Sequence, residues 1–180
     1  MDDRAIDAAL ATGGAAIFRA SDTFSGIIAI MRASTEANNV TAERLDQAAA
    51  QGRMDTSDVV EDLAEIQGGL NARLAPLAAQ LTDDVHDIDA AIGTALDGLE
   101  TRTERPDVRH VLRSVGVVGA ESEFLSKVID IAGMESLDET NPILAEVARE
   151  RAVSLHAVIA SCAALAKLGA RARAADPYQD

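Results

Sequence analysis

Residues 6–31, IDAALATGGAAIFRASDTFSGIIAIM, carry the pattern that decides the fold. Apolar or small side chains recur there in alternating steps of four and three residues, which is the heptad spacing of a helix packed along other helices. This spacing predicts a helix from about residue 2 to residue 37, with a weak point at Gly13 and Gly14 and an end at Asn38 and Asn39. The row consists of Ile6, Leu10, Gly13, Ile17, Ala20, Phe24, Ile27 and Met31.

The same spacing continues toward the middle of the chain. Thr41 is expected to cap a short helix over 42–51 that closes at Gly52. A long helical run then begins after Asp55, Thr56 and Ser57, which are capping residues, and continues to about residue 100. Two glycines and a proline interrupt this run, at Gly68, Gly69 and Pro76, so we expect one bent helix or two nearly collinear helices. Its apolar row is Val60, Leu63, Ile66, Leu70, Leu74, Leu77, Leu81, Val85, Ile88, Ile92, Leu96 and Leu99.

Two more helices are predicted in the C-terminal part. Pro106 suits a first helical turn, where its missing N–H costs nothing, and begins a helix over 107–132. Gly116 and Gly119 fit inside this helix only where another backbone packs closely. Asn141 and Pro142 are a cap and a start for a last helix over 142–173. The two apolar rows are Val108, Val111, Leu112, Val115, Phe124, Leu125, Val128 and Ile129, and then Leu144, Ala148, Arg151, Leu155, Val158, Cys162 and Leu165.

Composition supports the same fold class. Apolar residues make up 48% of the 180 residues, which is enough for a core, whereas aromatic residues make up only 2%, so the aromatic runs typical of sheets are missing. We therefore expect an all-α, elongated antiparallel helical bundle with coiled-coil-like heptad seams. The expected organisation is a single helical domain over 1–180, with acidic N-terminal helices at 1–104, a C-terminal helical hairpin at 105–175 and a flexible tail at 176–180. The seams and the scarcity of large side chains also favour a homodimer.

The charge of the chain restricts its partners. Sixteen basic and 30 acidic side chains give a net charge of −14. Nucleic acids and anionic membranes repel such a surface, so we expect no nucleic-acid partner and no membrane insertion. A basic protein partner remains compatible with this charge. The N-terminus is acidic where a secretion signal is basic, and the uncharged stretch 152–166 is shorter than the roughly 20 residues of a membrane span, so a cytoplasmic location is expected.

The densest acidic cluster has two interpretations. It lies in the long middle helix and could form a patch that binds a cation or a basic partner. The alternative is the solvated face of a helix whose dry face is Leu81, Val85, Ile88 and Ile92. The members of the cluster are Asp83, Asp84, Asp87 and Asp89.

Metal and cofactor chemistry have little support in the sequence. Cys162 is the single cysteine, so no internal disulfide and no cysteine metal cluster can form. Asp83 and Asp107 stand one helical turn before His86 and His110, an arrangement that di-iron bundle sites use in pairs. With a chain reversal near 102–106 the two histidines lie about 18 Å apart along the bundle axis. We therefore expect separate helix faces, no metal and no cofactor.

The segment His110-Val111-Leu112-Arg113-Ser114 resembles the phosphoacceptor box of sensor histidine kinases, which usually reads His, an acid, Leu, Arg, Ser or Thr, then Pro. The resemblance covers about 107–172. It implies an antiparallel helical hairpin that dimerises into a four-helix bundle, with His110 as the phosphoacceptor. Val111 departs from the pattern at the position of the acid, and Val115 departs from it at the position of the proline.

Two further polar residues lie in the last helix. His156 is similar in spacing to the histidine of monodomain phosphotransfer proteins, but Ile159 and Ala160 replace the expected Lys and Gly, so a buried or half-buried structural histidine is expected. Arg151 lies on the apolar row. It either sets the register or oligomeric state, or lays its stem along the apolar surface with its head in water.

The sequence contains no recognisable set of nucleophile, base and oxyanion donors. The expected function is therefore non-enzymatic: a scaffold, adaptor or regulatory module that acts through helix surfaces. The alternative is a histidine-phosphotransfer module with His110 as acceptor. Because 152–166 is uncharged, the last helix is expected to be buried on more than one face, and Val158→Asp is expected to abolish the folded or dimeric state, unlike Ala42→Asp.

Overall fold

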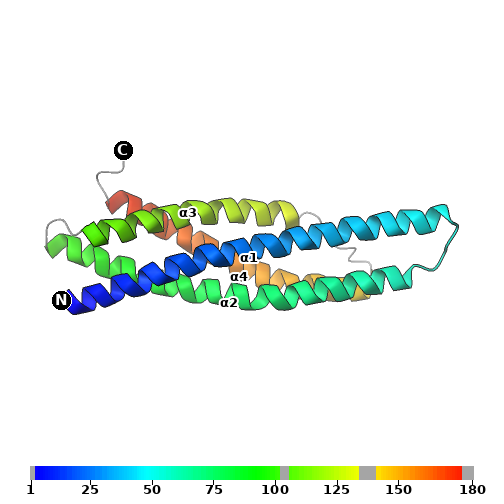
Figure 1. Ribbon diagram of the computed structural model, residues 1–180, viewed down its shortest axis with the longest axis horizontal. Helices are drawn as coiled ribbons and strands as arrows, with labels where there is room; N and C mark the ends of the chain where they lie inside the picture. Colours follow the sequence, from blue (N-terminus) through cyan, green and yellow to red (C-terminus); the bar gives the residue numbers. More distant parts are fainter. Residues whose placement is uncertain (1–2, 102–105, 134–140, 176–180) are drawn as a thin grey trace.

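The computed structural model describes residues 3–101, 106–133 and 141–175 and consists of four long helices (Figure 1). These are α1 (Asp3–Ala50), α2 (Ser57–Thr101), α3 (Pro106–Gly133) and α4 (Pro142–Ala175). Consecutive helices run in opposite directions, and the described ranges hold no strand. The expected all-α helical bundle is thus confirmed. The tail predicted at 176–180 lies outside the described residues.

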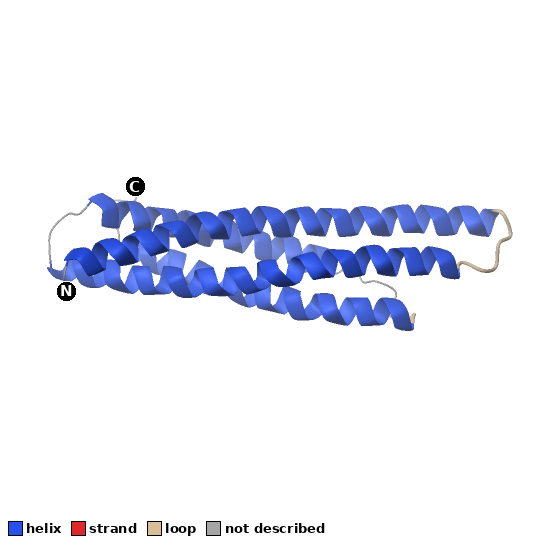
Figure 2. Cartoon of the chain, turned by 60° about the horizontal axis from the view of Figure 1, so that its bottom comes forward, coloured by secondary structure: helices blue, strands red, loops and turns tan. Residues whose placement is uncertain are grey.

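The four helices form a bundle in which chain neighbours are not always packing neighbours. α1 packs along α2 and α3, and α4 likewise packs along α2 and α3. The consecutive helices α2 and α3 therefore lie on one diagonal of the bundle, and α1 and α4 lie on the other. α1 has 48 residues, which at 1.5 Å per residue is about 70 Å. The hairpin of α1 and α2 extends beyond the other two helices, as the loop at its tip shows (Figure 2).

The core follows the predicted apolar rows. Every member of the row over residues 6–31 is buried, and one large cluster joins side chains from all four helices. A smaller cluster near the α1–α2 tip contains Leu63, Ala64, Leu144 and Val147. Two row members were predicted wrongly, because Ile66 and Phe124 are exposed. The next residue of α2, Gln67, is buried in place of Ile66.

The predicted break at Asn38 and Asn39 is wrong, because α1 continues without interruption to Ala50. Asparagine favours helix ends in isolation, but here the Asn38 side chain accepts a hydrogen bond of 2.8 Å from Gln67 Nε2 on α2. Thr41, expected as a cap, is buried within the helix. A tertiary contact thus overrides the local preference. α2 runs through Pro76 as one helix, which is the first of its two expected arrangements.

Glycines mark the places where two helices approach most closely. A Cβ at Gly13 would clash with Ala91 of α2, so the suspected weak point of α1 is a close contact. A Cβ at Gly119 would lie 2.8 Å from the Cα of Gly169 and 3.0 Å from the carbonyl oxygen of Leu165. Gly119 therefore does meet another backbone, as expected. Gly116 adds a carbonyl that accepts a 2.9 Å hydrogen bond from Arg173.

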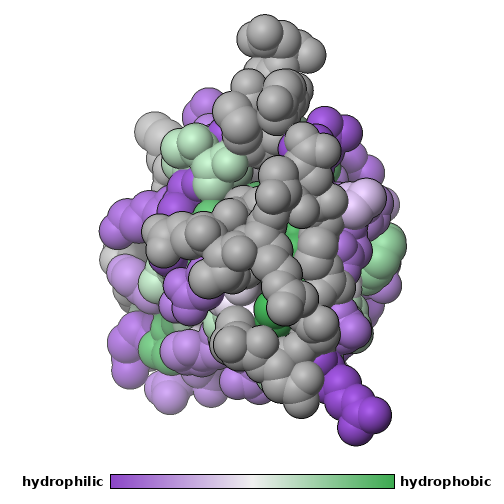
Figure 3. Space-filling model, turned by 90° about the vertical axis from the view of Figure 1, so that its left-hand side faces the viewer, coloured by the Kyte–Doolittle hydropathy of each residue, from purple (hydrophilic) through white to green (hydrophobic). Residues whose placement is uncertain are grey.

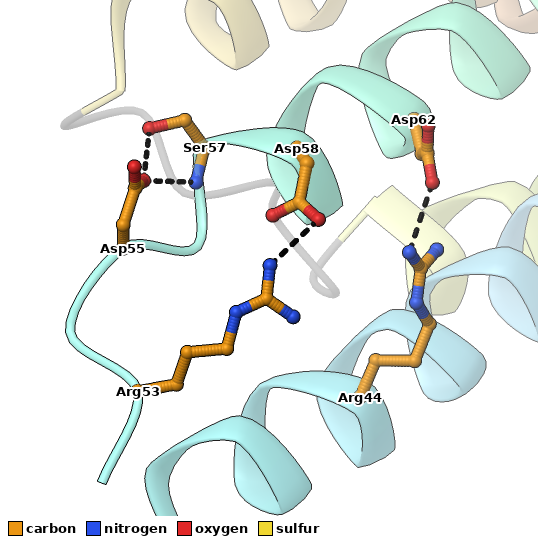
Figure 4. A network of polar contacts seen from close by, with 6 residues as sticks. All are labelled: Arg44, Arg53, Asp55, Ser57, Asp58 and Asp62. Carbon is orange, nitrogen blue, oxygen red and sulfur yellow. Dashed lines mark hydrogen bonds and ion pairs between the residues drawn. The ribbon is translucent and has the colours of Figure 1, made fainter.

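The α1–α2 connection is fixed by local polar contacts (Figure 4). Gly52 adopts a φ of 71°, the left-handed conformation of a helix C-terminus, as expected. Asp55 Oδ1 accepts hydrogen bonds from the hydroxyl and the backbone N–H of Ser57, and these lower the pKa of the carboxyl. Arg53 pairs with Asp58 at 2.9 Å and lowers the pKa of that carboxyl as well. Asn141 Oδ1 caps α4 in the same manner by accepting from the Ile143 N–H.

The prediction that α4 is buried on more than one face is only partly right. Val158 is fully buried, but an outer stripe of the uncharged stretch faces solvent: Ala152, Val153, His156, Ala160 and Ala163. Two helices, one over Arg4–Ala50 and the other α4, are long and apolar enough to cross a membrane by length and composition. Core helices of soluble proteins pass the same test, and 44% of each apolar window is buried inside the bundle.

Candidate interaction surface

The outer side of α1 carries few charges for so acidic a protein. Among residues 8–31 the formally charged side chains are Arg19 and Asp22. Arg19 is engaged by α2, because its guanidinium lies 2.8 Å from Asp84 and 2.9 Å from Asp87. Interfaces are depleted in charged residues at their centres, so a stretch of this kind on an exposed helix is a candidate contact surface.

Large apolar side chains gather beside this stretch, where α1 meets α3. The Ser21 hydroxyl donates a 2.9 Å hydrogen bond to Glu121 and brings the two helices together. Phe18 lies one turn before Ser21, and Val117 and Phe124 lie one turn on either side of Glu121. These three side chains are 74%, 58% and 63% exposed, respectively. We call this surface, together with the groove described next, the α1–α3 face.

The groove lies between the N-terminal parts of α1 and α3 and has a volume of about 400 Å³. α1 and α3 meet more sparsely than the other neighbouring helices, which leaves this seam open. Gly14 lines the groove without a side chain, and a Cβ there would meet nothing within 4 Å, so the groove is open at this position. The lining residues are Asp7, Leu10, Ala11, Gly14, Ile17, Phe18, Asp107, His110, Val111 and Ser114. Figure 3 shows one end of the bundle, where hydrophobic residues lie scattered among hydrophilic ones.

His110 is exposed on α3 and lines this groove. It also lines a neighbouring recess of about 330 Å³ together with Pro106, Arg109 and Arg113. Val111, which occupies the position of the acid in the phosphoacceptor box, is buried, so a carboxylate there would face the core. The acidic side chains that line the groove with His110 are Asp7 and Asp107.

The hairpin implied by the resemblance to sensor histidine kinases is present as α3 and α4, but its surroundings differ. In that family a second copy of the hairpin completes the four-helix bundle. Here α1 and α2 of the same chain pack against the hairpin and complete the bundle. Dimerisation through the inner face of the hairpin is therefore sterically closed to this chain.

The other histidines lie outside this surface. His156 was expected to be buried or half-buried, but it is exposed, with Nδ1 2.7 Å from the carbonyl oxygen of Ala152. His86 is exposed on α2. In the ranges 3–101, 106–133 and 141–175, no group of three or more His, Cys, Asp or Glu residues is arranged to hold a metal ion. Cys162 is buried, and burial raises the pKa of its thiol to about 12.

The acidic cluster is divided between the interior and the surface. Asp84 is fully buried, which corrects both interpretations that placed it on a solvated patch. Its Oδ1 accepts hydrogen bonds from Arg19 Nε at 2.8 Å and from Gln80 at 3.2 Å, while its Oδ2 has no hydrogen-bond partner among the described residues. The hydrogen bond to Asp84 raises the pKa of Arg19. Asp89 lies 3.8 Å from Arg171 of α4, so the cluster also serves contacts within the bundle.

The guanidinium of Arg151 points into the bundle and not into water, which favours the first of the two interpretations of this residue. Across the bundle diagonal, Nη1 donates a 2.8 Å hydrogen bond to the hydroxyl of Ser34 on α1. Nε donates to Asn71 Oδ1 at 3.0 Å, and Nη2 donates to Gln67 Oε1, both on α2. These acceptors are neutral, so among the described residues the guanidinium is desolvated without a counter-charge, and burial lowers its pKa.

We call Ser34, Gln67, Asn71 and Arg151 the polar layer. Its members also bond one another and the backbone: Gln67 Nε2 donates to the Ser34 carbonyl at 3.1 Å, and Asn71 Nδ2 donates to the Val147 carbonyl at 2.8 Å. A layer with its hydrogen bonds satisfied at one height fixes the register of α1, α2 and α4. It belongs to the scaffold that holds the α1–α3 face.

Of the α1–α3 face, the sequence identified His110 as a candidate site residue but not the three exposed apolar residues. Phe124 belongs to a predicted core row, and Phe18 lies outside the heptad row of its helix. No sequence signal marks them, because their exposure depends on how the helices pack. No family model, curated protein or solved structure matches this chain.

Proposed function

We propose that this protein is a non-enzymatic interaction module that binds through helix surfaces, with the α1–α3 face as its contact site. The observation that carries the proposal is the exposure of Phe18, Val117 and Phe124 beside an open groove. Contiguous exposed apolar surface rimmed by polar residues marks interaction sites in proteins. The rigid bundle holds these anchors in place, so little conformational entropy is lost on binding.

Site-specific photo-cross-linking tests this proposal directly. A benzoylphenylalanine introduced in place of Phe18 reports whatever protein contacts the face in cells that express the chain. The same probe at Val153, which is 73% exposed on α4, is the matched control. A protein adduct at residue 18 and none at residue 153 is the expected result. Absence of any protein adduct at residue 18 contradicts the proposal.

Histidine phosphotransfer through His110 is the second candidate. It is favoured by the exposure of the imidazole in a recess that also presents Arg109 and Arg113, since guanidinium groups suit phosphoryl oxygens. Transfer from acetyl phosphate would form an N–P bond at the imidazole and release acetate. An acid-labile label on the wild type that His110→Gln abolishes is the required result. An unlabelled wild type rules this candidate out.

A further inference from the structure

We infer that the α1–α3 face is the contact between two copies of this chain, packed antiparallel about a twofold axis at the level of residue 16. The inference rests on the proposed function and names the occupant of the face. Three features of the described residues carry it: the shape of the face, the placement of its charges, and the position of the remaining acidic groups.

The shape of the face is self-complementary. Phe18 protrudes into solvent, and Gly14, where no side chain fills the groove, lies one helical turn before it. Leu10 and Ile17 provide apolar walls for this part of the groove. An axis midway between residues 14 and 18 brings the Phe18 ring of each copy to the level of Gly14 in the other. In a closed twofold dimer the same patch of each copy must carry both the protruding group and the groove that receives it.

The charges of the face favour the antiparallel arrangement. About this axis, Asp22 comes to the level of Leu10 in the second copy, and Asp7 comes to the level of Ser25. Acidic groups of α1 then face uncharged ones. A parallel arrangement in register would place Asp7 and Asp22 each opposite its own copy, and like charges in contact are destabilising.

The remaining charges and surfaces argue against other occupants. The groove itself carries two acidic residues, Asp7 and Asp107. The larger cluster of Asp83, Asp87 and Asp89, which would attract a basic peptide more strongly, lies on α2 outside the groove lining. The stripe on α4 offers Val153 as its one large exposed apolar group. A second copy brings a surface of equally low charge to the α1–α3 face and leaves most acidic groups of both chains in water.

Sedimentation velocity over a range of protein concentrations tests the inference. The wild type is expected to be a dimer, and Phe18→Asp is expected to weaken dimerisation by at least about tenfold, because it places a carboxylate at the centre of the contact. Val153→Asp adds the same charge at an equally exposed apolar position and should leave the dimer intact. Since both side chains are exposed, both variants should retain the circular dichroism of the wild type.

Single-cysteine cross-linking tests the geometry. The buried native Cys162 does not compete with an introduced thiol. Ala15 is exposed close to the proposed axis, so Ala15→Cys should form a disulfide-linked dimer on oxidation. In the antiparallel arrangement the exposed Ala8 lies about 24 Å along the axis from its copy, so Ala8→Cys should remain unlinked.

Several results would overturn the inference. These are a monomeric wild type at every concentration, a dimer that survives Phe18→Asp, a dimer lost in Val153→Asp, or efficient linkage through Ala8→Cys. Binding of the monomer to phosphatidylcholine vesicles that Phe18→Asp abolishes would reassign the face to a lipid surface. If the chain is monomeric and the probe at residue 18 links to a different protein, only this inference fails and the proposed function stands.

Discussion

Cys162 shows how the interior controls a single reactive group. Desolvation raises the pKa of its thiol from the ordinary 9.0 to about 12, so the folded protein holds the unreactive protonated form. We expect dithionitrobenzoate at pH 8 to leave the native protein unlabelled and to label one thiol per chain in urea. Rapid labelling of the native protein would show that α4 is open at this position.

The same shift has a consequence for stability at high pH. A raised pKa in the folded state leaves stability unaffected below the unfolded value, near pH 9, because the thiol is protonated in both states. Above that pH the unfolded chain ionises first, so stability falls until the pH passes about 12. Comparing the pH dependence of the melting temperature in wild type and Cys162→Ala isolates this contribution, which should be missing in the variant.

Among the arginines at the surface, removal of Arg19 should lower the free energy of unfolding most. Its removal leaves the fully buried carboxylate of Asp84 without its ion-pair partner, so Arg19→Ala should lower the free energy of unfolding clearly more than the loss of an exposed pair does. Arg44→Ala is the control, because Arg44 pairs with Asp62 where both side chains are exposed, and such pairs contribute about 1 kcal/mol or less. Urea unfolding of the two variants measures the difference. Equal losses would mean that water reaches Asp84 freely.

At the scale of the helices, the contact of α3 with α4 depends on two glycines. A methyl group at Gly119 would lie 2.8 Å from the backbone of Gly169, which cannot move as a flexible side chain can. Gly119→Ala should therefore destabilise the fold by about 1–3 kcal/mol. Gly68→Ala, in open space on α2, should instead stabilise it by up to about 1 kcal/mol through helix propensity. The opposite order of melting temperatures would contradict this packing.

The elements were predictable to the extent that local chemistry determines them. The row over residues 6–31, the turn at Gly52 and the cap at Asn141 are local signals, and each is present in the structure. The continuation of α1 past Asn38 was not predictable, because it depends on a partner in α2 that lies far away in the sequence. The inward turn of Gln67 has the same origin, since Arg151 of α4 accounts for its burial.

The candidate surface was less predictable than the helices. Apolar periodicity identifies which residues can face a core, but a bundle of four helices leaves some of them outside. Phe124 fits its row in α3 and is nevertheless exposed, because α1 packs only sparsely along this side. Exposure of this kind depends on how closely two helices approach, which a single sequence does not specify.

At the scale of the whole molecule, the bundle separates a stabilising interior from a surface available for contacts. α1 and α2 cover the inner face of the α3–α4 hairpin, so one chain completes a bundle that sensor histidine kinases form from two. The proposed association of copies would then use an outer face. The α1–α3 face is an outer surface on which exposed apolar groups lie beside a groove.

The most direct test of this account is the concentration dependence of hydroxyl-radical labelling at Phe18. Met54, which is 97% exposed at the tip of the α1–α2 hairpin, provides the internal reference within the same sample. If the α1–α3 face is covered by a second copy, the labelling of Phe18 relative to Met54 falls as the protein concentration rises. A ratio that stays constant from the lowest to the highest concentration would contradict the account.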